Sequence, residues 1–160
     1  MPGSFRRSED LFPDRSVREI LVQRPAAVHA VRPQDPVSAA LRLMTAHDIG
    51  LVVVLEAGRL AGVLSERDLV RHAGGGASLG ALAVAELMTR QVVTVGPDDS
   101  FGQCMALMDR HGTRHLPVVD ADRVVAVLSV RDLLREAVAQ HRRMQAGMDR
   151  ERLAAFQSAY

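Results

Sequence analysis

The feature that most constrains the fold of this chain is an internal repeat, because the sequence matches itself when it is shifted by 64 residues. Residues 28–73 align with residues 92–137 at 18 identities in 46 positions. The densest match covers Val63–Leu69 and Val127–Leu133, which share the polar motif Ser-x-Arg-Asp. Identity of this density at one fixed shift indicates a duplicated structural unit. The sequence therefore predicts two copies of one fold that share an interface.

Each copy is predicted to begin with a short helix and to continue in the order β-α-β-β-α. Continuous apolar runs indicate buried strands, and apolar residues every three to four positions indicate helices. In the first copy the predicted elements are a helix at 17–23, a strand at 27–31, a helix after Asp35, a hairpin of 51–55 with 60–64, and a helix at 66–72. In the second copy they are a helix at 84–89, a strand at 91–95, a helix after Asp99, a hairpin of 116–119 with 124–128, and a helix at 130–140. Asp35 and Asp99 are expected to cap the helices that follow them.

The repeat divides the chain into five segments. They are an N-terminal extension (1–16), a first repeat (17–73), a Gly-rich linker (74–80), a second repeat (81–140) and a C-terminal tail (141–160). The tail is Arg-rich and helical in composition, with Met144, Met148 and Phe156 near four-residue spacing. Such a tail either packs on the domain or takes part in self-association, and the sequence leaves both open.

Composition excludes several classes of function. The formal net charge is +1 and the chain contains no lysine, so neither a phosphate-loop lysine nor a Schiff-base lysine is available. Cys104 is the single cysteine, and its place on an apolar helix face predicts a buried thiol rather than a nucleophile. No apolar run is long enough to span a membrane, and the N-terminus lacks the apolar core of a signal peptide. We therefore expect a soluble cytoplasmic protein.

The motif at Ser65–Asp68 and Ser129–Asp132 lies where a buried strand leads into a helix. Free N–H groups and the positive end of the helix dipole make such a turn suitable for an anion. A serine hydroxyl there can donate to a phosphate oxygen, and an aspartate three residues later can accept the hydroxyls of a ribose. Serine and aspartate at this spacing are also close to a capping box, which needs no ligand. The residues of one motif alone leave both interpretations open.

This arrangement resembles the cystathionine-β-synthase (CBS) domain. The resemblance is carried by Gly62–Asp68 and Ala126–Asp132, which end the last strand and open the last helix, and by Arg114–Asp120 in the second strand of the second copy. It covers about 17–140 and occurs twice, as in the tandem pair called a Bateman module. The fold that it implies is α/β (α+β), with two β-α-β-β-α repeats packed as a pseudo-two-fold pair, followed by a C-terminal helix.

The resemblance implies a ligand that contains adenosine, such as AMP, ADP, ATP, NAD or S-adenosylmethionine, with no required cofactor. It also implies that each cleft takes residues from both repeats. One cleft would combine Ser129 and Asp132 with Ile49, Gly50 and Leu51, and the other would combine Ser65 and Asp68 with Thr113, Arg114 and His115. The apolar motif residues Val63 and Val127 belong to the same expected set. Arg67 and Arg131, beside the motif aspartates, either bind phosphate or form structural ion pairs.

The two copies also differ in ways that predict unequal clefts. Ala126 replaces the motif glycine, where we expect the additional methyl group to be tolerated. Gly50 and Leu51 in the first copy correspond to Arg114 and His115 in the second. Because arginine is well suited to binding phosphate in a bidentate manner, the clefts should differ in affinity. The cleft that receives Arg114 depends on how the repeats pack, which the sequence does not determine.

The leading functional hypothesis is a non-catalytic regulatory module that senses an adenine nucleotide and transmits the ligand state to a protein partner. The resemblance implies a homodimer, in which two chains form a disc of four repeats. An enzyme is less favoured, because no catalytic set can be named. A nucleic-acid binder that uses the Arg-rich segment 131–152 is the other alternative, although acidic residues interleave there and stacking aromatics are lacking. His111 and His115 fall on different predicted elements, so we expect no metal site.

Overall fold

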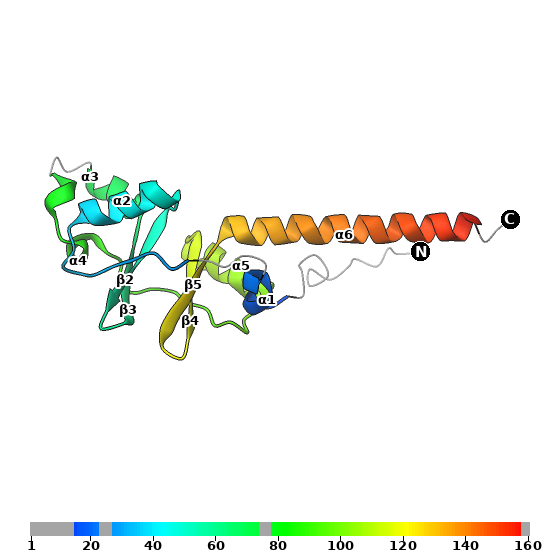
Figure 1. Ribbon diagram of the computed structural model, residues 1–160, viewed down its shortest axis with the longest axis horizontal. Coiled ribbons are helices and arrows are strands. Elements are labelled where there is room, and N and C mark those ends of the chain that lie inside the picture. Colours follow the sequence, from blue (N-terminus) through cyan, green and yellow to red (C-terminus); the bar gives the residue numbers. More distant parts are fainter. Residues whose placement is uncertain (1–14, 23–26, 74–77, 158–160) are drawn as a thin grey trace.

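Residues 15–22, 27–73 and 78–157 of the chain are described by a computed structural model. The elements are α1 (Val17–Val22), β1 (Ala30–Val31), α2 (Val37–His47), β2 (Leu51–Glu56), β3 (Arg59–Ser65), α3 (Glu66–Ala73), the 3₁₀ helix η2 (Leu79–Ala81), α4 (Val84–Leu87), α5 (Phe101–His111), β4 (His115–Asp120), β5 (Arg123–Ser129) and α6 (Val130–Gln157). The mixture of helices and strands and the long final helix confirm the predicted α+β fold class (Figure 1). Most of the N-terminal extension and of the Gly-rich linker lies outside the described residues.

The duplication is visible in the register of the two hairpins. Strands β2 and β3 pair antiparallel, with Leu51 opposite Ser65. Strands β4 and β5 pair with His115 opposite Ser129, which is the same register shifted by 64 residues. A register irregularity also occurs at the equivalent point of both hairpins. The two copies therefore reproduce each other in backbone pairing as well as in sequence.

The first strand of the two copies differs, in contrast to the prediction. Strand β1 pairs parallel with β2, and the N–H of Val53 donates to the carbonyl of His29 at 3.1 Å. In the second copy the strand predicted at 91–95 is reduced to a single parallel bridge at Val95. The counterpart of Val53 is Pro117, whose nitrogen carries no hydrogen, so the corresponding backbone bond cannot form. One substitution in β4 thus shortens the pairing of its neighbour.

The helix that precedes each copy in the sequence packs on the other copy. Helix α1 contributes to the core of the second copy, where Val17 is fully buried, and α4 contributes to the core of the first, where Val84 is fully buried. The N–H groups of these residues donate to the carbonyls of Asp99 and Asp35 respectively, both at 2.9 Å. A third apolar cluster joins the two hairpins. Because each core needs residues from both halves, the copies form one structural unit.

The predicted helix caps at Asp35 and Asp99 are wrong. Both carboxylates close the turn that precedes the helix: Asp35 accepts from the N–H of Arg32 at 2.8 Å, and Asp99 from that of Gly96 at 2.7 Å. Helix α2 begins without a side-chain cap, and α5 is capped by Ser100 in a capping box. The helices start later than predicted, because these aspartates already bond to N–H groups three residues before them.

The connection between the copies crosses closely over β3 at Gly62. Thr89 and Val63 exchange backbone hydrogen bonds of 2.8 and 3.0 Å, and α4 accordingly ends at Leu87, two residues earlier than predicted. A Cβ atom at Gly62 would lie 2.7 Å from the carbonyl oxygen of Thr89, which is closer than van der Waals contact permits. The glycine of the first motif is therefore required by backbone packing. Its counterpart Ala126 is buried in the core of the second copy.

Helix α6 continues through the predicted tail as one helix of 28 residues. It projects away from the two hairpins, and every described side chain from 141 to 156 is exposed (Figure 1). Packing of the tail on the domain, one of the two predicted arrangements, is therefore wrong for the described residues, among which Met144 and Met148 are about half exposed. Self-association stays a prediction. Among the described helices, none is long and apolar enough to cross a membrane.

Candidate functional site

Both Ser-x-Arg-Asp motifs form the same set of hydrogen bonds at the start of their helices. In each copy the serine hydroxyl donates to Oδ2 of the aspartate at 2.6 Å, and the serine N–H donates to the same oxygen at 2.9 Å. The aspartate N–H donates back to the serine Oγ, at 3.3 Å for Asp68 and 3.2 Å for Asp132. The capping interpretation is therefore confirmed in both copies. Capping engages Oδ2, so it does not by itself prevent a carboxylate from accepting further hydrogen bonds through its other oxygen.

A cleft of about 920 Å³ lies between the two repeats. Nine of the predicted site residues line it: Ile49, Gly50, Leu51, Arg114, His115, Val127, Ser129, Arg131 and Asp132. The structure thus brings together the first predicted set, in which the motif of the second copy faces the start of β2. Arg114 and His115, which were predicted on the opposite cleft, line this one as well. The cleft that receives Arg114, which the sequence left open, is therefore the one that Asp132 also lines.

The other five predicted residues, Val63, Ser65, Arg67, Asp68 and Thr113, do not line this cleft. Arg67 donates through Nη1 to the carbonyl of Gly112 at 2.8 Å, which is neither of the two roles expected for it. The Thr113 hydroxyl donates to the carbonyl of His115 at 2.9 Å. The motif of the first copy therefore faces the loop that precedes β4, in agreement with the predicted grouping. A ligand site there stays a prediction.

Backbone bonds hold the residue before each hairpin over the start of the last helix of its copy. The carbonyl of Gly50 accepts from the N–H of Glu66 at 3.1 Å, and that of Arg114 accepts from Val130 at 2.9 Å. A Cβ atom at Gly50 would lie 3.1 Å from the Glu66 carboxylate and 3.5 Å from the His115 ring. Residues from both repeats therefore converge at this point of the cleft, and the small size of Gly50 leaves room for them.

The second copy supplies the positive charge of the cleft. Arg131 and Arg135 lie one turn apart in the first turns of α6, and Arg114 lies beside the N-terminus of the same helix. Within the described part of the chain, none of these three arginines takes part in an ion pair shorter than 4.0 Å. Guanidinium groups and the N–H groups of a helix N-terminus are both donors that suit an anion. The carboxylates that line the same cleft are Asp48, Glu66, Asp132 and Glu136.

Three histidines line the cleft, of which sequence reasoning identified only His115 as a site residue. The rings of His29 and His47 stack with centroids 3.8 Å apart. Burial and the neighbouring His47 lower the pKa of His29. Burial, followed by the charge of Arg114, lowers the pKa of His115. No spacing in the sequence pairs His29 with His47, because one precedes β1 and the other ends α2.

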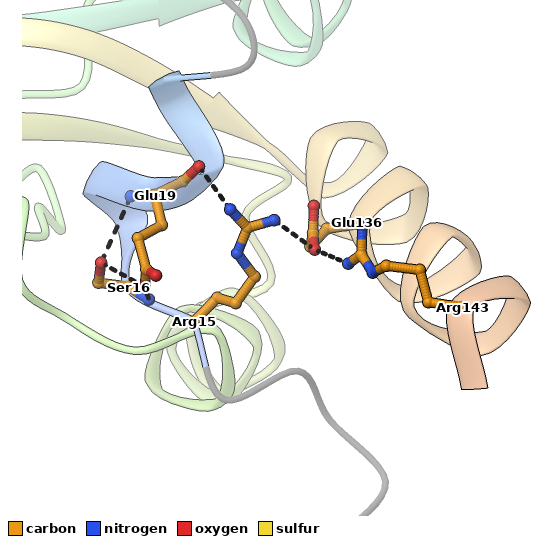
Figure 2. Close-up of polar contacts among 5 residues, drawn as sticks. All are labelled: Arg15, Ser16, Glu19, Glu136 and Arg143. Carbon is orange, nitrogen blue, oxygen red and sulfur yellow. Dashed lines mark hydrogen bonds and ion pairs between the residues drawn. The ribbon is translucent and has the colours of Figure 1, made fainter. Parts of the chain in front are cut away.

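A buried carboxylate connects the cleft to the projecting part of α6. Glu136 lines the cleft, is 6% exposed, and accepts through Oε1 from Arg15 at 2.9 Å and from Arg143 at 2.8 Å (Figure 2). Arg15 also donates to the carbonyl of Glu19, whose carboxylate accepts from the Ser16 N–H and hydroxyl. Those bonds to Ser16 lower the pKa of Glu19. Glu136 and Arg15 are 121 residues apart, so the sequence contained no signal for this network.

A metal site and the single cysteine were the other chemical candidates that the sequence raised. Within the described ranges, no three histidine, cysteine or carboxylate side chains are grouped so as to hold a metal ion. Cys104 is fully buried in the core of the second copy. Burial, with the charge of Asp99 as a smaller contribution, raises the pKa of its thiol to about 11, so it is a core residue rather than a nucleophile.

The fold and the cleft define a tandem α+β protein with a ligand-sized cavity between its repeats. The family model described as "CBS domain" matches residues 17–75 and 84–139, and the chain therefore belongs to the CBS domain family as a tandem pair. The CBS domain-containing protein YhcV of Bacillus subtilis is 32% identical over 106 residues, which cover 66% of this chain and 76% of YhcV.

Solved structures agree with the family assignment. The crystal structure of the CBS domain NE2398 is 35% identical, with a TM-score of 0.76, over 79% of this chain and 99% of that one. The CBS domain pair of protein MJ0100, solved in complex with 5′-methylthioadenosine and S-adenosyl-L-methionine, is 22% identical, with a TM-score of 0.69, over 80% of this chain and 99% of that one. At this identity the second likeness concerns the fold alone.

Proposed function

We propose that this chain is a regulatory module that binds an adenosine-containing nucleotide in the cleft between its CBS repeats and transmits the ligand state to a protein partner. The observation that carries the proposal is the meeting of Ser129 and Asp132 with the start of β2 around one cleft of about 920 Å³. A volume of this order is typical of sites for small organic ligands. The bound 5′-methylthioadenosine and S-adenosyl-L-methionine of MJ0100 support an adenosyl ligand at the level of the fold.

The residues around the cleft suit the parts of a nucleotide. The N-terminus of α6, with Arg114 and Arg131, offers N–H and guanidinium donors to phosphate. We assign the hydroxyls of a ribose to the Asp132 carboxylate, which lines the same cleft. Ile49 and Leu51 supply apolar surface for a base. AMP, ADP, ATP, NAD and S-adenosylmethionine are all consistent with this division.

The test is a thermal-unfolding panel with these five ligands and NADH, followed by calorimetric titration of any ligand that stabilises the protein. A ligand at 100 times its Kd should stabilise the protein by about 2.7 kcal/mol. The duplication provides a matched pair of variants, Asp132→Ala and Asp68→Ala. Both remove the same cap, with the same bond lengths, but only Asp132 lines the described cleft.

We expect Asp132→Ala to abolish or strongly weaken binding of the ligand to the described cleft. Asp68→Ala should leave the affinity of this cleft largely unchanged. In each variant the lost helix cap alone should cost about 1 kcal/mol of stability. Equal losses of affinity would contradict the assignment of the site to this cleft. Failure of every ligand to shift the unfolding transition would refute the adenosine-sensor proposal.

Three further expectations stay proposals. The module is expected to act without catalysis, to form a homodimer of four repeats, and to be located in the cytoplasm. Light scattering coupled to size-exclusion chromatography, with and without ligand, tests the second of these. A mass of one chain at concentrations well above the ligand Kd would contradict the homodimer.

A further inference from the structure

His115 lies at the centre of the charged groups of the cleft. It opens β4, and its ring approaches the position that a Cβ atom at Gly50 would occupy to within 3.5 Å. Glu66 of α3 faces it from the first repeat. Arg114, Arg131 and Asp132 surround it from the second, and all of these residues line the cleft. Two arginines and two carboxylates therefore act on one half-buried imidazole.

The balance of these groups favours the neutral ring in the free protein. Burial has the largest effect on the pKa of His115 and lowers it, and the charges of Arg114 and Arg131 act in the same direction. Asp132 and Glu66 oppose them without reversing the shift. The imidazole is therefore mostly uncharged at neutral pH, and it is held in that state partly by the two arginines to which an anionic ligand would bind.

We propose that His115 takes up a proton when a phosphate-bearing nucleotide binds in the cleft, so that affinity for the nucleotide rises as the pH falls. This inference rests on the proposed function and adds a pH response to it. A phosphate bound by Arg114 and Arg131 cancels the positive field of these side chains at the ring and adds a negative charge beside it. An opposite charge within about 4–6 Å raises the pKa of a basic group by about one to three units.

The other two imidazoles of the cleft are less suited to this role. His29 stacks on His47, and burial and the neighbouring His47 lower the pKa of His29. They lie on the wall formed by the first repeat, whereas the arginines among the described lining residues come from the second. A phosphate held by those arginines is therefore expected to act chiefly on His115.

The direct test follows the Cε1–H signal of His115 by NMR between about pH 5.5 and pH 8.5, in the free protein and with saturating ADP or saturating adenosine. The His115→Asn variant identifies the signal among the six histidines of the chain, and His115→Gln is the alternative if Asn does not fold. We expect ADP to raise the pKa of His115 by about one unit or more. Adenosine, which lacks the phosphates, should not raise it.

The second test measures the Kd for ADP by calorimetry at about pH 8 and about pH 6. A rise of one pKa unit corresponds to a gain in affinity of up to about tenfold over this range. The pH response should be smaller in His115→Asn and unchanged in His111→Asn, because His111 ends α5 outside the cleft. The protonation of ADP itself is common to all three proteins, so the difference between them isolates the histidine.

The outcomes separate the two proposals. If no nucleotide binds, the proposed function fails and this inference fails with it. If ADP binds but the pKa of His115 stays unchanged or falls, the inference alone is overturned. An equal pH response in the wild type and in His115→Asn also overturns it, because the proton would then be taken up elsewhere.

Discussion

The carboxylate of Glu136 joins Arg15 of the N-terminal segment to α6 and also pairs with Arg143 of the same helix, and the effect of removing its charge can be calculated (Figure 2). A hydrogen bond to a charged group contributes about 1.5–3 kcal/mol when both partners are shielded from water. Arg15 is 21% exposed, so its bond to Glu136 lies near the lower part of that range. Arg143 is 52% exposed, and its bond is worth about 0–1 kcal/mol after solvent screening.

These values predict the effect of Glu136→Gln, which keeps the shape of the side chain and one acceptor oxygen but removes the charge. The bond to Arg15 would then be an ordinary one, worth about 0.5–1 kcal/mol, and the bond to the exposed Arg143 would contribute about 0 kcal/mol. The expected net loss is therefore about 1–2 kcal/mol. For a chain of this size such a loss lowers Tm by about 2–8 °C.

The assay is urea unfolding followed by far-ultraviolet circular dichroism, applied to Glu136→Gln, Arg15→Gln and Arg143→Gln. Arg15→Gln should destabilise the protein more than Arg143→Gln, because Arg15 is less exposed. Arg142→Gln serves as the matched control, since it changes an exposed arginine of the same helix. If Glu136→Gln unfolds at the same urea concentration as the wild type, the ion pairs contribute nothing and the reasoning is refuted. A larger loss for Arg143→Gln than for Arg15→Gln would show that the exposure argument is wrong.

Three further predictions follow from individual contacts. Gly62→Ala should destabilise the protein by about 1–3 kcal/mol in urea unfolding, because its methyl group would overlap the Thr89 carbonyl; an unchanged midpoint would contradict this. The pKa values of His29 and His115 are lowered in the folded state, so the free energy of unfolding is highest above about pH 6.5 and decreases as the pH falls through the folded-state pKa values. Thermal unfolding of the free protein from about pH 7.5 to about pH 5.5 should therefore show a falling Tm, with a smaller fall in His115→Asn. A chain that ends at Gln140 should keep its Tm to within about 4 °C, because the residues removed up to 156 are exposed; a larger fall in calorimetry would show that the projecting helix is packed.

The helices and strands were predictable because each local sequence pattern occurs in both copies of the repeat. The hairpins and the helices that follow them appear at the predicted places, since continuous apolar strands and amphipathic helices are local features. The convergence of Ser129 and Asp132 with the start of β2 was inferred from the CBS resemblance and not from spacing. Arg114 and His115, which that inference assigned to the other cleft, line this one, so the resemblance did not determine how the two sets divide.

Contacts that depend on tertiary packing could not be read from the sequence. The bonds of Glu136 join residues 121 positions apart, and the stacking of His29 on His47 depends on where the end of a helix meets the start of a strand. The helix caps failed for a more local reason. Asp35 and Asp99 are suitable capping residues, but they bond backward into the preceding turn, and the two choices have the same sequence signature.

The sequence differences between the two copies explain why one cleft is lined by residues that were predicted to line two separate clefts. Gly50 and Arg114 are equivalent, and each lies over the start of the last helix of its own copy. Because the copies face each other, an arginine at both positions would crowd the place where Glu66 and His115 already converge. Glycine on one side and arginine on the other leaves a cleft whose arginines, among the described lining residues, belong to the second repeat. The asymmetry in sequence therefore gives a symmetric fold one cleft with the arginines and the imidazole on which the proposed nucleotide site depends.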